Sequence, residues 1–383
     1  MPKEKGVNMK RVIVIGAGIV GASTAYHLAK QGADVTVVDR KDKGQATDAA
    51  AGIICPWISQ RRNKAWYQLV KSGARYYPEL VDQLTADGEE NTGYLKVGAI
   101  SLHKDVEKLE KMAERAKKRR EDAPEIGEIK ILSPDETRTL FPPLDEEFGA
   151  VFVSGGARVD GRALREALLN GAKKHGAKLT EDNALALIHH NQRVTGVKLS
   201  GSEYHADTVV ITGGAWSKEL LKPLAIDFKV TPQKAQIVHL EMVETETTNW
   251  PVVMPPTNQY ILAFENGRVV VGATHEDEAG FDSRVTAGGI NEILEKALQI
   301  APGLKDATML ETRVGFRPFT PGFLPIIGPI PGYEGLLVAN GLGASGLTGG
   351  PYLGMELAKI ALDQPTELDL EQYPVSEAIE KVN

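Results

Sequence analysis

The start of the chain combines short apolar runs with one stretch of helical periodicity. Residues 12–15, VIVI, form a β-branched run that is typical of a buried parallel strand. Residues 19–30 carry apolar side chains at helical spacing, and residues 34–38, DVTVV, read as a second buried strand. The pattern therefore predicts a strand, a helix and a second strand in close succession.

The same two patterns recur further along. An amphipathic helix is predicted over 161–175, strands over 193–199 and 207–212, and a strand, a glycine loop and a helix over 336–362. Thr348 is expected to cap that last helix, which should begin near Pro351. Alternating segments at 235–242, 259–264 and 268–274 predict antiparallel strands, and a helix is expected near 289–299.

This order predicts an α/β protein with a discontinuous nucleotide-binding domain and an inserted α+β domain built on an antiparallel sheet. We expect the nucleotide-binding domain to comprise 1–92, 150–222 and 321–383. The inserted domain, which would hold the substrate, should comprise 93–149 and 223–320.

One predicted helix, residues 105–121, is strongly charged. Its apolar positions, Val106, Leu109, Met112, Ala113 and Ala116, share one face, and lysine, arginine and glutamate cover the other. We interpret it as a solvated surface helix. A basic site for a partner is the alternative.

Composition narrows the possible chemistry. The 383 residues carry a net charge of −7, which argues against nucleic-acid binding. The single cysteine, Cys55, excludes an internal disulfide, and no cysteine-based zinc site or iron–sulfur cluster is expected. No metal site is predicted, so electrons would move through an organic cofactor. With no apolar leader and no run long enough to span a membrane, a cytoplasmic soluble protein is expected.

The glycines between the first strand and helix carry the first chemical signal. Gly16, Gly18 and Gly21 have the spacing of a dinucleotide fingerprint, which provides a tight turn, a close approach to pyrophosphate and tight helix packing. Asp39 follows Gly21 by eighteen residues, at the end of the second strand, where a carboxylate can accept hydrogen bonds from a ribose. A dinucleotide site is therefore predicted.

Three further segments favour a flavin over nicotinamide. They are QATDAAAGIICPW (45–57), ADTVVITGGAW (206–216) and GLGASGLTGGPYLG (341–354). Small residues in the first allow backbone to approach a flat ring. The positive end of a helix in the third would stabilise the negative charge of a reduced flavin. A nicotinamide enzyme remains the rival interpretation.

These segments, with RVVVGAT and GFRPFTPGFLPIIG, resemble the family of glycine oxidase, sarcosine oxidase and D-amino-acid oxidase or dehydrogenase. The resemblance runs from Val12 to about Leu362. It implies FAD and the oxidation of an amine beside a carboxylate. Ala49 stands where relatives with covalent FAD carry a histidine, and GFRPFTPG contains no cysteine of the kind that sarcosine oxidase uses, so non-covalent FAD is expected.

The resemblance also implies site roles. Arg317 in GFRP matches the arginine that binds the substrate carboxylate, and Tyr260 matches a tyrosine of the glycine oxidase pocket. His275 stands where glycine oxidase has a methionine; by residue type it is a candidate base, with a structural role as the alternative. Ala344 stands where glycine oxidase has a second arginine. The expected cofactor-binding residues are Gly16, Gly18, Ile19, Val20, Gly21, Asp39, Arg40, Thr47, Ala50, Ala51, Gly52, Ile54, Ala184, Gly213, Gly214, Trp216, Gly343, Ser345, Gly346, Leu347 and Thr348.

The expected reaction is oxidative deamination of glycine, a D-amino acid or an N-substituted glycine, by hydride transfer from Cα to flavin N5, with oxygen or a quinone as final acceptor. Two alternatives stay open: a sarcosine-type secondary-amine oxidase or dehydrogenase, and a flavin-bearing subunit of a larger complex. A homo-oligomer is also compatible with the sequence.

Overall fold

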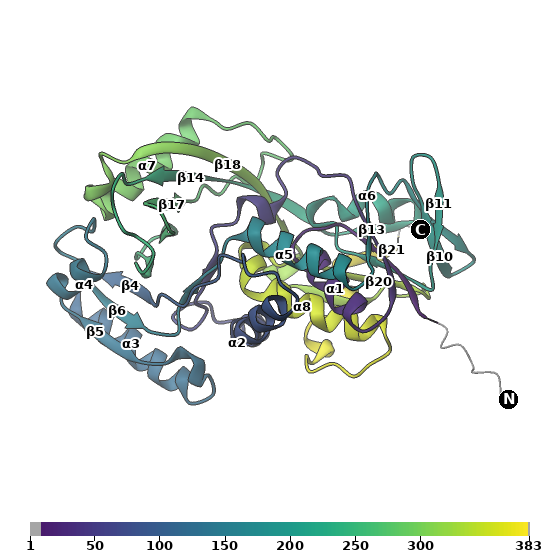
Figure 1. The fold of residues 1–383 in the computed structure, drawn as a ribbon, viewed down its shortest axis with the longest axis horizontal. Helices are drawn as coiled ribbons and strands as arrows, with labels where there is room; N and C mark the ends of the chain where they lie inside the picture. Colours follow the sequence, from purple (N-terminus) through teal and green to yellow (C-terminus); the bar gives the residue numbers. More distant parts are fainter. Residues whose placement is uncertain (1–8, 382–383) are drawn as a thin grey trace.

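A computed structural model describes residues 9–381 and shows two sheets side by side (Figure 1). The first sheet has six strands, all parallel except for the antiparallel pair at one edge, β19 and β20. In spatial order the strands are β19 (Ile326–Pro329), β20 (Leu336–Asn340), β12 (Thr208–Ile211), β1 (Arg11–Ile15), β2 (Asp34–Asp39) and β8 (Lys178–Glu181).

Both faces of this sheet are buried, which explains the uninterrupted apolar run of β1. Val12 and Val14 pack towards a helical layer, and Ile13 and Ile15 pack on the opposite side. The helical layer consists of α1 (Ile19–Lys30), α2 (Lys64–Ala86), α5 (Gly161–Lys174) and α8 (Gly346–Ala361). The opposite side is covered by β9 (Ala186–His190), β10 (Arg193–Lys198) and β11 (Glu203–His205), with α6 (Ser217–Leu221), β13 (Ile226–Phe228) and β21 (Ile379–Lys381) nearby.

The second sheet has eight strands and is antiparallel except where β15 meets β4. Its order is β18 (Thr308–Phe319), β14 (Thr231–Glu241), β17 (Arg268–Gly272), β16 (Tyr260–Ala263), β15 (Val252–Met254), β4 (Ala99–His103), β6 (Gly149–Val153) and β5 (Ile129–Leu132). The helices α3 (Val106–Arg120), α4 (Pro134–Leu140) and α7 (Ala287–Ile300) belong to this half of the molecule. A two-stranded ribbon of β3 (Ile53–Ile54) and β7 (Ala157–Arg158) completes the described strands.

The predicted fold class is confirmed, because a mainly parallel sheet assembled from separated segments lies beside an antiparallel one. The domain boundaries stay a prediction. The division placed at residue 150 falls inside β6, all of whose pairings are to the antiparallel sheet. Similarly, β13 lies in the segment assigned to the inserted domain but pairs with β21.

Helix α3 departs from its predicted pattern at one position. Leu109, Met112, Ala113 and Ala116 are buried as expected, but Val106 is 62% exposed. Val106 is the first residue of the helix, directly after the N-cap residue Asp105. It therefore lies at the helix end, away from the sheet that buries the rest of the apolar face. Within residues 9–381, no helix is both long and apolar enough to cross a membrane.

Candidate active site

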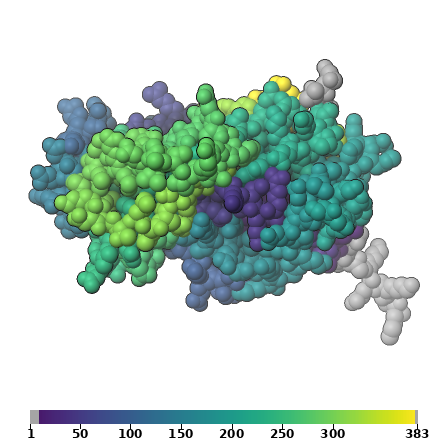
Figure 2. Space-filling model, turned by 90° about the horizontal axis from the view of Figure 1, so that it is seen from above, coloured from purple at the N-terminus to yellow at the C-terminus, as the bar shows by residue number. Residues whose placement is uncertain are grey.

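A cavity of about 560 Å³ lies between the two sheets and is the centre of the candidate site. Its wall is assembled from segments that lie far apart in the sequence: 15–20, 38–59, 182–185, 211–220, 258–275, 315–318 and 342–348. Figure 2 shows this region from above, where purple atoms of the N-terminal part lie on the floor of a depression between green and teal segments. The cavity thus joins the carboxyl end of the parallel sheet to the antiparallel sheet.

The three glycines after β1 have different surroundings. Gly16 has a φ of +99°, and a Cβ there would lie 2.7 Å from the carbonyl oxygen of Thr212. Gly18 faces the cavity, and a Cβ there would have only the hydroxyl of Thr47 within 4 Å, at 3.5 Å. Gly21 does not line the cavity; a Cβ there would lie 1.8 Å from the carbonyl oxygen of Gly16. Gly16 and Gly21 therefore allow the turn to close, and Gly18 leaves room for a ligand.

Asp39 lies on the cavity wall, but protein donors already occupy much of its carboxylate. Oδ2 accepts a hydrogen bond of 2.6 Å from the backbone N–H of Ala17. Oδ1 accepts bonds from the backbone N–H of Lys41 at 2.6 Å and from Nε2 of Gln45 at 2.9 Å. A carboxylate has about four acceptor positions, so a further bond to a ribose remains possible for Asp39 beside its role in shaping the glycine loop.

Arg40 and Ala184 mark the same end of the cavity. The guanidinium of Arg40 forms ion pairs of 2.5 Å with Asp42 and 2.9 Å with Glu219, and it donates a hydrogen bond to Asn183. These contacts join the loop after β2 to the segments after β8 and β12. Arg40 therefore braces this end of the wall.

Small side chains form the middle of the wall. Ala50, Ala51, Gly52, Gly213 and Gly214 all line the cavity, as do the predicted residues Ile19, Val20, Thr47, Trp216, Gly343, Ser345, Gly346, Leu347 and Thr348.

Ile54 is an exception, because its side chain is 1% exposed in the core and its neighbours Ile53 and Cys55 line the cavity instead. The resemblance places Ile54 among the cofactor residues, and that role stays a prediction. Successive side chains of a strand point to opposite faces, which explains why the side chain of Ile54 lies in the core. Burial raises the pKa of the Cys55 thiol to about 12, which keeps it protonated.

Helix α8 begins earlier than predicted. It starts at Gly346 rather than near Pro351, and the hydroxyl of Thr348 donates a 2.9 Å hydrogen bond to the carbonyl of Ile53 instead of capping the helix. Pro351 lies inside the helix and has no N–H for the carbonyl of Leu347, four residues earlier. The hydroxyl of Tyr77 donates to that carbonyl at 2.5 Å. A side chain from α2 therefore replaces the missing backbone donor.

The three predicted substrate residues meet at the other end of the cavity. Arg317 projects from β18, Tyr260 from β16, and His275 from the loop after β17. Arg317 is half-buried and donates a 3.1 Å hydrogen bond from Nη1 to Oε1 of Gln233. Among residues 9–381, no carboxylate lies within 4.0 Å of its guanidinium. Arg317 is thus a cation on the cavity wall whose protein hydrogen-bond partner is neutral.

The charge of Arg317 shifts the pKa values of the neighbouring Tyr260 and His275. Burial raises the pKa of Tyr260, and the nearby Arg317 guanidinium opposes that rise. Burial lowers the pKa of His275, and the positive charge of Arg317 lowers it further. Nδ1 of His275 lies 3.4 Å from the side-chain nitrogen of Asn258. This end of the cavity therefore offers a cation, a protonated phenol and a neutral imidazole at pH 7.

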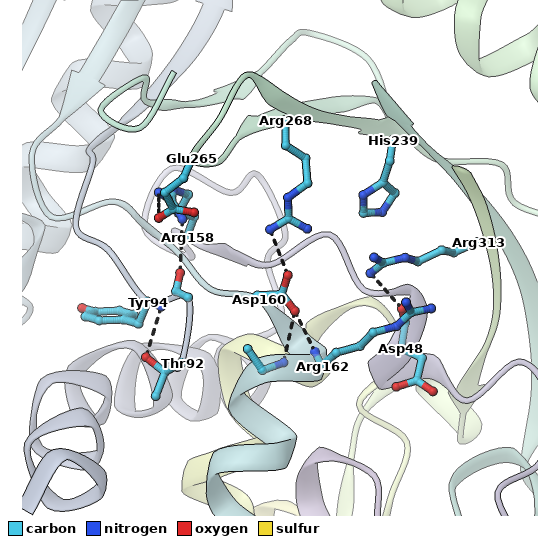
Figure 3. Close-up of polar contacts among 12 residues, drawn as sticks. Asp48, Thr92, Tyr94, Arg158, Asp160, Arg162, His239, Glu265, Arg268 and Arg313 are labelled. Carbon is cyan, nitrogen blue, oxygen red and sulfur yellow. Dashed lines mark hydrogen bonds and ion pairs between the residues drawn. The ribbon is translucent and has the colours of Figure 1, made fainter. Parts of the chain in front are cut away.

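Two ion pairs tie the antiparallel sheet to the parallel sheet's side of the molecule (Figure 3). Arg158 is fully buried and contacts Glu265 at 2.7 Å, and Arg268 contacts Asp160 at 3.0 Å. Asp160 is also the N-cap residue of α5. The two pairs thereby link β7 and α5 to the β16–β17 hairpin.

His239 of β14 lies beside this junction and is 2% exposed (Figure 3). Neither ring nitrogen has a hydrogen-bond partner among the described residues. Burial lowers its pKa to about 4, with a further contribution from Arg313, which donates a 3.3 Å hydrogen bond to the carbonyl of Asp48. His239 is therefore neutral at pH 7.

Sequence reasoning missed Gln233 and Asn258. Gln233 holds Arg317 because β14 and β18 pair with these two residues in register, and Asn258 contacts His275 across the β16–β17 hairpin. Each is a single polar residue in a strand or turn, and neither lies within a recognisable sequence motif. The strand predicted over 235–242 begins two residues after Gln233, and its alternation fixes neither the partner strand nor the register.

Comparisons with known proteins agree with this architecture. A family model described as FAD dependent oxidoreductase matches residues 11–360. A protein of Bacillus subtilis named uncharacterized oxidoreductase YurR is 62% identical over 372 residues, which is 97% of this chain and 100% of the relative. A glycine oxidase of Pseudomonas aeruginosa is 31% identical over 95% of this chain and 98% of its own. The crystal structure of iminodiacetate oxidase from Chelativorans sp. BNC1 has a TM-score of 0.92 and 46% identity, covering 95% of this chain and 98% of that one.

Proposed function

We propose, from the premise that this chain belongs to the family of FAD-dependent oxidoreductases, that it oxidises a small amine bearing a carboxylate on the same carbon. The favoured class is N-substituted glycines, of which N-methylglycine (sarcosine) is the simplest member. Arg317 carries this proposal, because it is a half-buried cation on the cavity wall with no carboxylate within 4.0 Å among the described residues. Identity of 46% to iminodiacetate oxidase favours a secondary amine over a primary one.

The residues present fit FAD. Gly18 leaves the glycine loop open, and a Cβ at Gly346 would have no atom within 4 Å, so backbone at both ends of the wall can approach a ligand. Gly16, Gly18 and Asp39 would hold the dinucleotide part, and Ala50, Gly52 and the start of α8 would border the ring. When bound, FAD accepts a hydride from the carbon next to the amine.

The protein's own groups would bind and orient the substrate. Arg317 presents a planar fork to the carboxylate, which favours two parallel charge-assisted hydrogen bonds. The phenol of Tyr260, protonated because burial raises its pKa, can donate a third bond. These contacts would fix the carbon between the amine and the carboxylate in one orientation.

The amine must be unprotonated when the hydride leaves, because an ammonium has no lone pair to form the C=N bond. His275 remains neutral at pH 7 because its pKa is lowered, so it can accept that proton. Loss of a hydride from the neutral amine R–NH–CH2–COO⁻, with its nitrogen lone pair forming the C=N bond, gives the iminium R–NH⁺=CH–COO⁻. Addition of water then yields R–NH3⁺ and glyoxylate.

Anaerobic flavin bleaching tests the proposal. The purified holoenzyme is mixed with iminodiacetate, sarcosine, glycine, D-alanine and L-alanine, and with N-methylated amines that lack a carboxylate. We expect loss of visible absorbance with iminodiacetate or sarcosine and formation of glyoxylate. Air is then readmitted: rapid return of the visible absorbance shows that oxygen can accept the electrons, and its absence points to another acceptor. Equal bleaching by amines without a carboxylate, or none by any member of the panel in protein that releases FAD on denaturation, would contradict the proposal.

A further inference from the structure

A second cavity, of about 510 Å³, lies on the other side of the segment that borders the active-site cavity. Within that segment Pro56, Ser59 and Trp66 line the first cavity, and residues 60–64 line the second. The C-terminal half of α3 supplies the facing wall. Five cationic side chains line the second cavity, and none of its lining residues is acidic: the cations are Arg61, Arg62, Lys64, Arg115 and Arg119.

None of these five cations is neutralised by the protein. Among residues 9–381, no carboxylate lies within 4.0 Å of any of them, although the chain as a whole carries a charge of −7. Arg119 donates hydrogen bonds to the carbonyls of Trp57 at 2.5 Å and Ser59 at 2.7 Å. Arg61 donates to the carbonyl of Phe323. A neutral carbonyl accepts a hydrogen bond from a guanidinium N–H group but does not neutralise the positive charge of the arginine.

Two buried polar atoms at this cavity lack partners. Nε of Arg115 and the hydroxyl of Tyr67 are inaccessible, and neither has a hydrogen-bond partner among the described residues. In folded proteins most buried polar groups are paired. Burial lowers the pKa of Arg119; the adjacent Tyr67 opposes this shift, and Arg115 adds to it. The cations of this cavity therefore repel one another, and two of its hydrogen-bond donors have no partner among the described residues.

The acidic residues nearby are engaged outside the cavity. Asp122 pairs with Lys71 at 2.9 Å, and Glu125 pairs with Arg75 at 3.3 Å. Neither carboxylate lines the cavity. Among residues 9–381, the five cations thus have no carboxylate that neutralises them, which leaves them available to an anion.

We propose that this second cavity binds a small polyanion with at least two phosphate or carboxylate groups. Guanidinium groups match both oxyanions through paired hydrogen bonds. A volume of about 510 Å³ is in the range of small-molecule sites and exceeds what one inorganic anion fills. Helix α2 begins at Lys64 in the cavity wall without an acidic residue in its first turn, so its positive end adds to the attraction.

The site would lie next to the reaction but apart from it. Arg119 holds the backbone of Trp57 and Ser59, and Nε1 of Trp66 donates a 2.9 Å hydrogen bond to Ser345 in the active-site wall. Ligand bound to Arg119 would thus contact the segment that separates the two cavities. The proposed oxidation does not require it.

Isothermal titration calorimetry of the holoenzyme tests the site, with pyrophosphate and citrate as probes at a fixed ionic strength of about 0.15 M, where surface attraction is screened. The test variant is R62Q/K64Q, which removes two exposed cations of the cavity. The matched control is K117Q/K118Q, which removes two exposed cations of α3 outside it. A second test variant, Arg115→Gln, addresses the buried donor.

We expect one site per chain and an affinity that falls on the order of tenfold in R62Q/K64Q and in Arg115→Gln, as loss of a charge-assisted contact predicts. Affinity should be unchanged in K117Q/K118Q. Binding of pyrophosphate alone would identify phosphate as the ligand group, citrate alone would identify carboxylate, and either result supports the site. Absence of binding by both probes, or equal weakening in the test and control double variants, would overturn it. Retention of FAD and of the thermal unfolding temperature shows that each variant is folded.

Discussion

Replacement of Arg317 by alanine tests whether this arginine binds the substrate or only stabilises the fold. In the protein its guanidinium has one hydrogen bond, to Gln233, and no carboxylate within 4.0 Å among residues 9–381. Loss of that bond, whose donor is charged, costs at most about 1.5–3 kcal/mol of folding free energy. The bound substrate loses more, because its carboxylate loses a charged fork.

The size of the catalytic effect follows from the same geometry. Hydrogen bonds to charged groups contribute about 1.5–3 kcal/mol each. Because Arg317 is half-buried, the pair of bonds should contribute about 2–4 kcal/mol in total rather than the full sum. That corresponds to a loss of roughly thirty- to a thousandfold in kcat/KM. Arg317→Lys should recover part of it, since lysine has the charge without the planar fork.

The assay compares kcat/KM for a carboxylated amine and for the same amine without its carboxylate, in FAD-loaded wild type and Arg317→Ala. We expect the loss to be confined to the carboxylated substrate. Arg313→Ala is the matched control, because Arg313 lies on the same strand but pairs with Glu311 and does not line the cavity. Equal losses on both substrates in Arg317→Ala, or no loss on either, would refute the anchoring role.

Three further predictions concern the cofactor and stability. Gly18→Ala should fold, because φ at Gly18 is −67°, but should bind FAD more weakly, because the new Cβ enters the cavity. Gly21→Ala should reduce the soluble yield, because its Cβ would lie 1.8 Å from the carbonyl oxygen of Gly16. Equal thermal stability of the two apoproteins would contradict this contrast. Tyr77→Phe should lower the free energy of unfolding by about 1–3 kcal/mol through an unpaired carbonyl, and addition of Pro351→Ala should recover part of it in denaturant titrations. The folded-state pKa of His239, about 4, lies below the unfolded value of about 6.5. The neutral, buried His239 therefore contributes fully to the free energy of unfolding above pH 6.5, and this contribution is lost as pH falls towards 4. His239→Gln should therefore reduce the fall in unfolding temperature between pH 7 and pH 5, and an unchanged fall would remove this residue as a cause.

Local patterns in the sequence predicted the local structure well. Helix α1 has the predicted bounds, because glycines fix its start and apolar spacing fixes its face. The predicted start of α8 was wrong for a physical reason. Pro351 is favoured in a first helical turn, but the hydroxyl of Tyr77, 270 residues before Leu347, bonds the Leu347 carbonyl and makes an interior position acceptable for the proline. No local pattern encodes that contact.

The candidate site shows the same division. The glycine loop could be located from its own motif, and Arg317 from the resemblance of GFRP to the family. Gln233 could not, because it meets Arg317 across 84 residues through strand register. The cationic cavity was anticipated only as the alternative of a basic partner site on helix 105–121, because the cavity itself forms only where residues 60–64 meet Arg115 and Arg119.

The order of strands in the parallel sheet has a consequence for synthesis of the protein. Strand β1 is made first, but the sheet receives β12 only at residue 208 and β20 only at residue 336, and the wall at 342–348 follows that strand. A nascent chain therefore exposes one flank of the parallel sheet until β20 leaves the ribosome. FAD can meet a complete binding surface only after that point, so cofactor capture should be one of the last steps of folding, and chains interrupted before β20 should remain colourless and prone to aggregation.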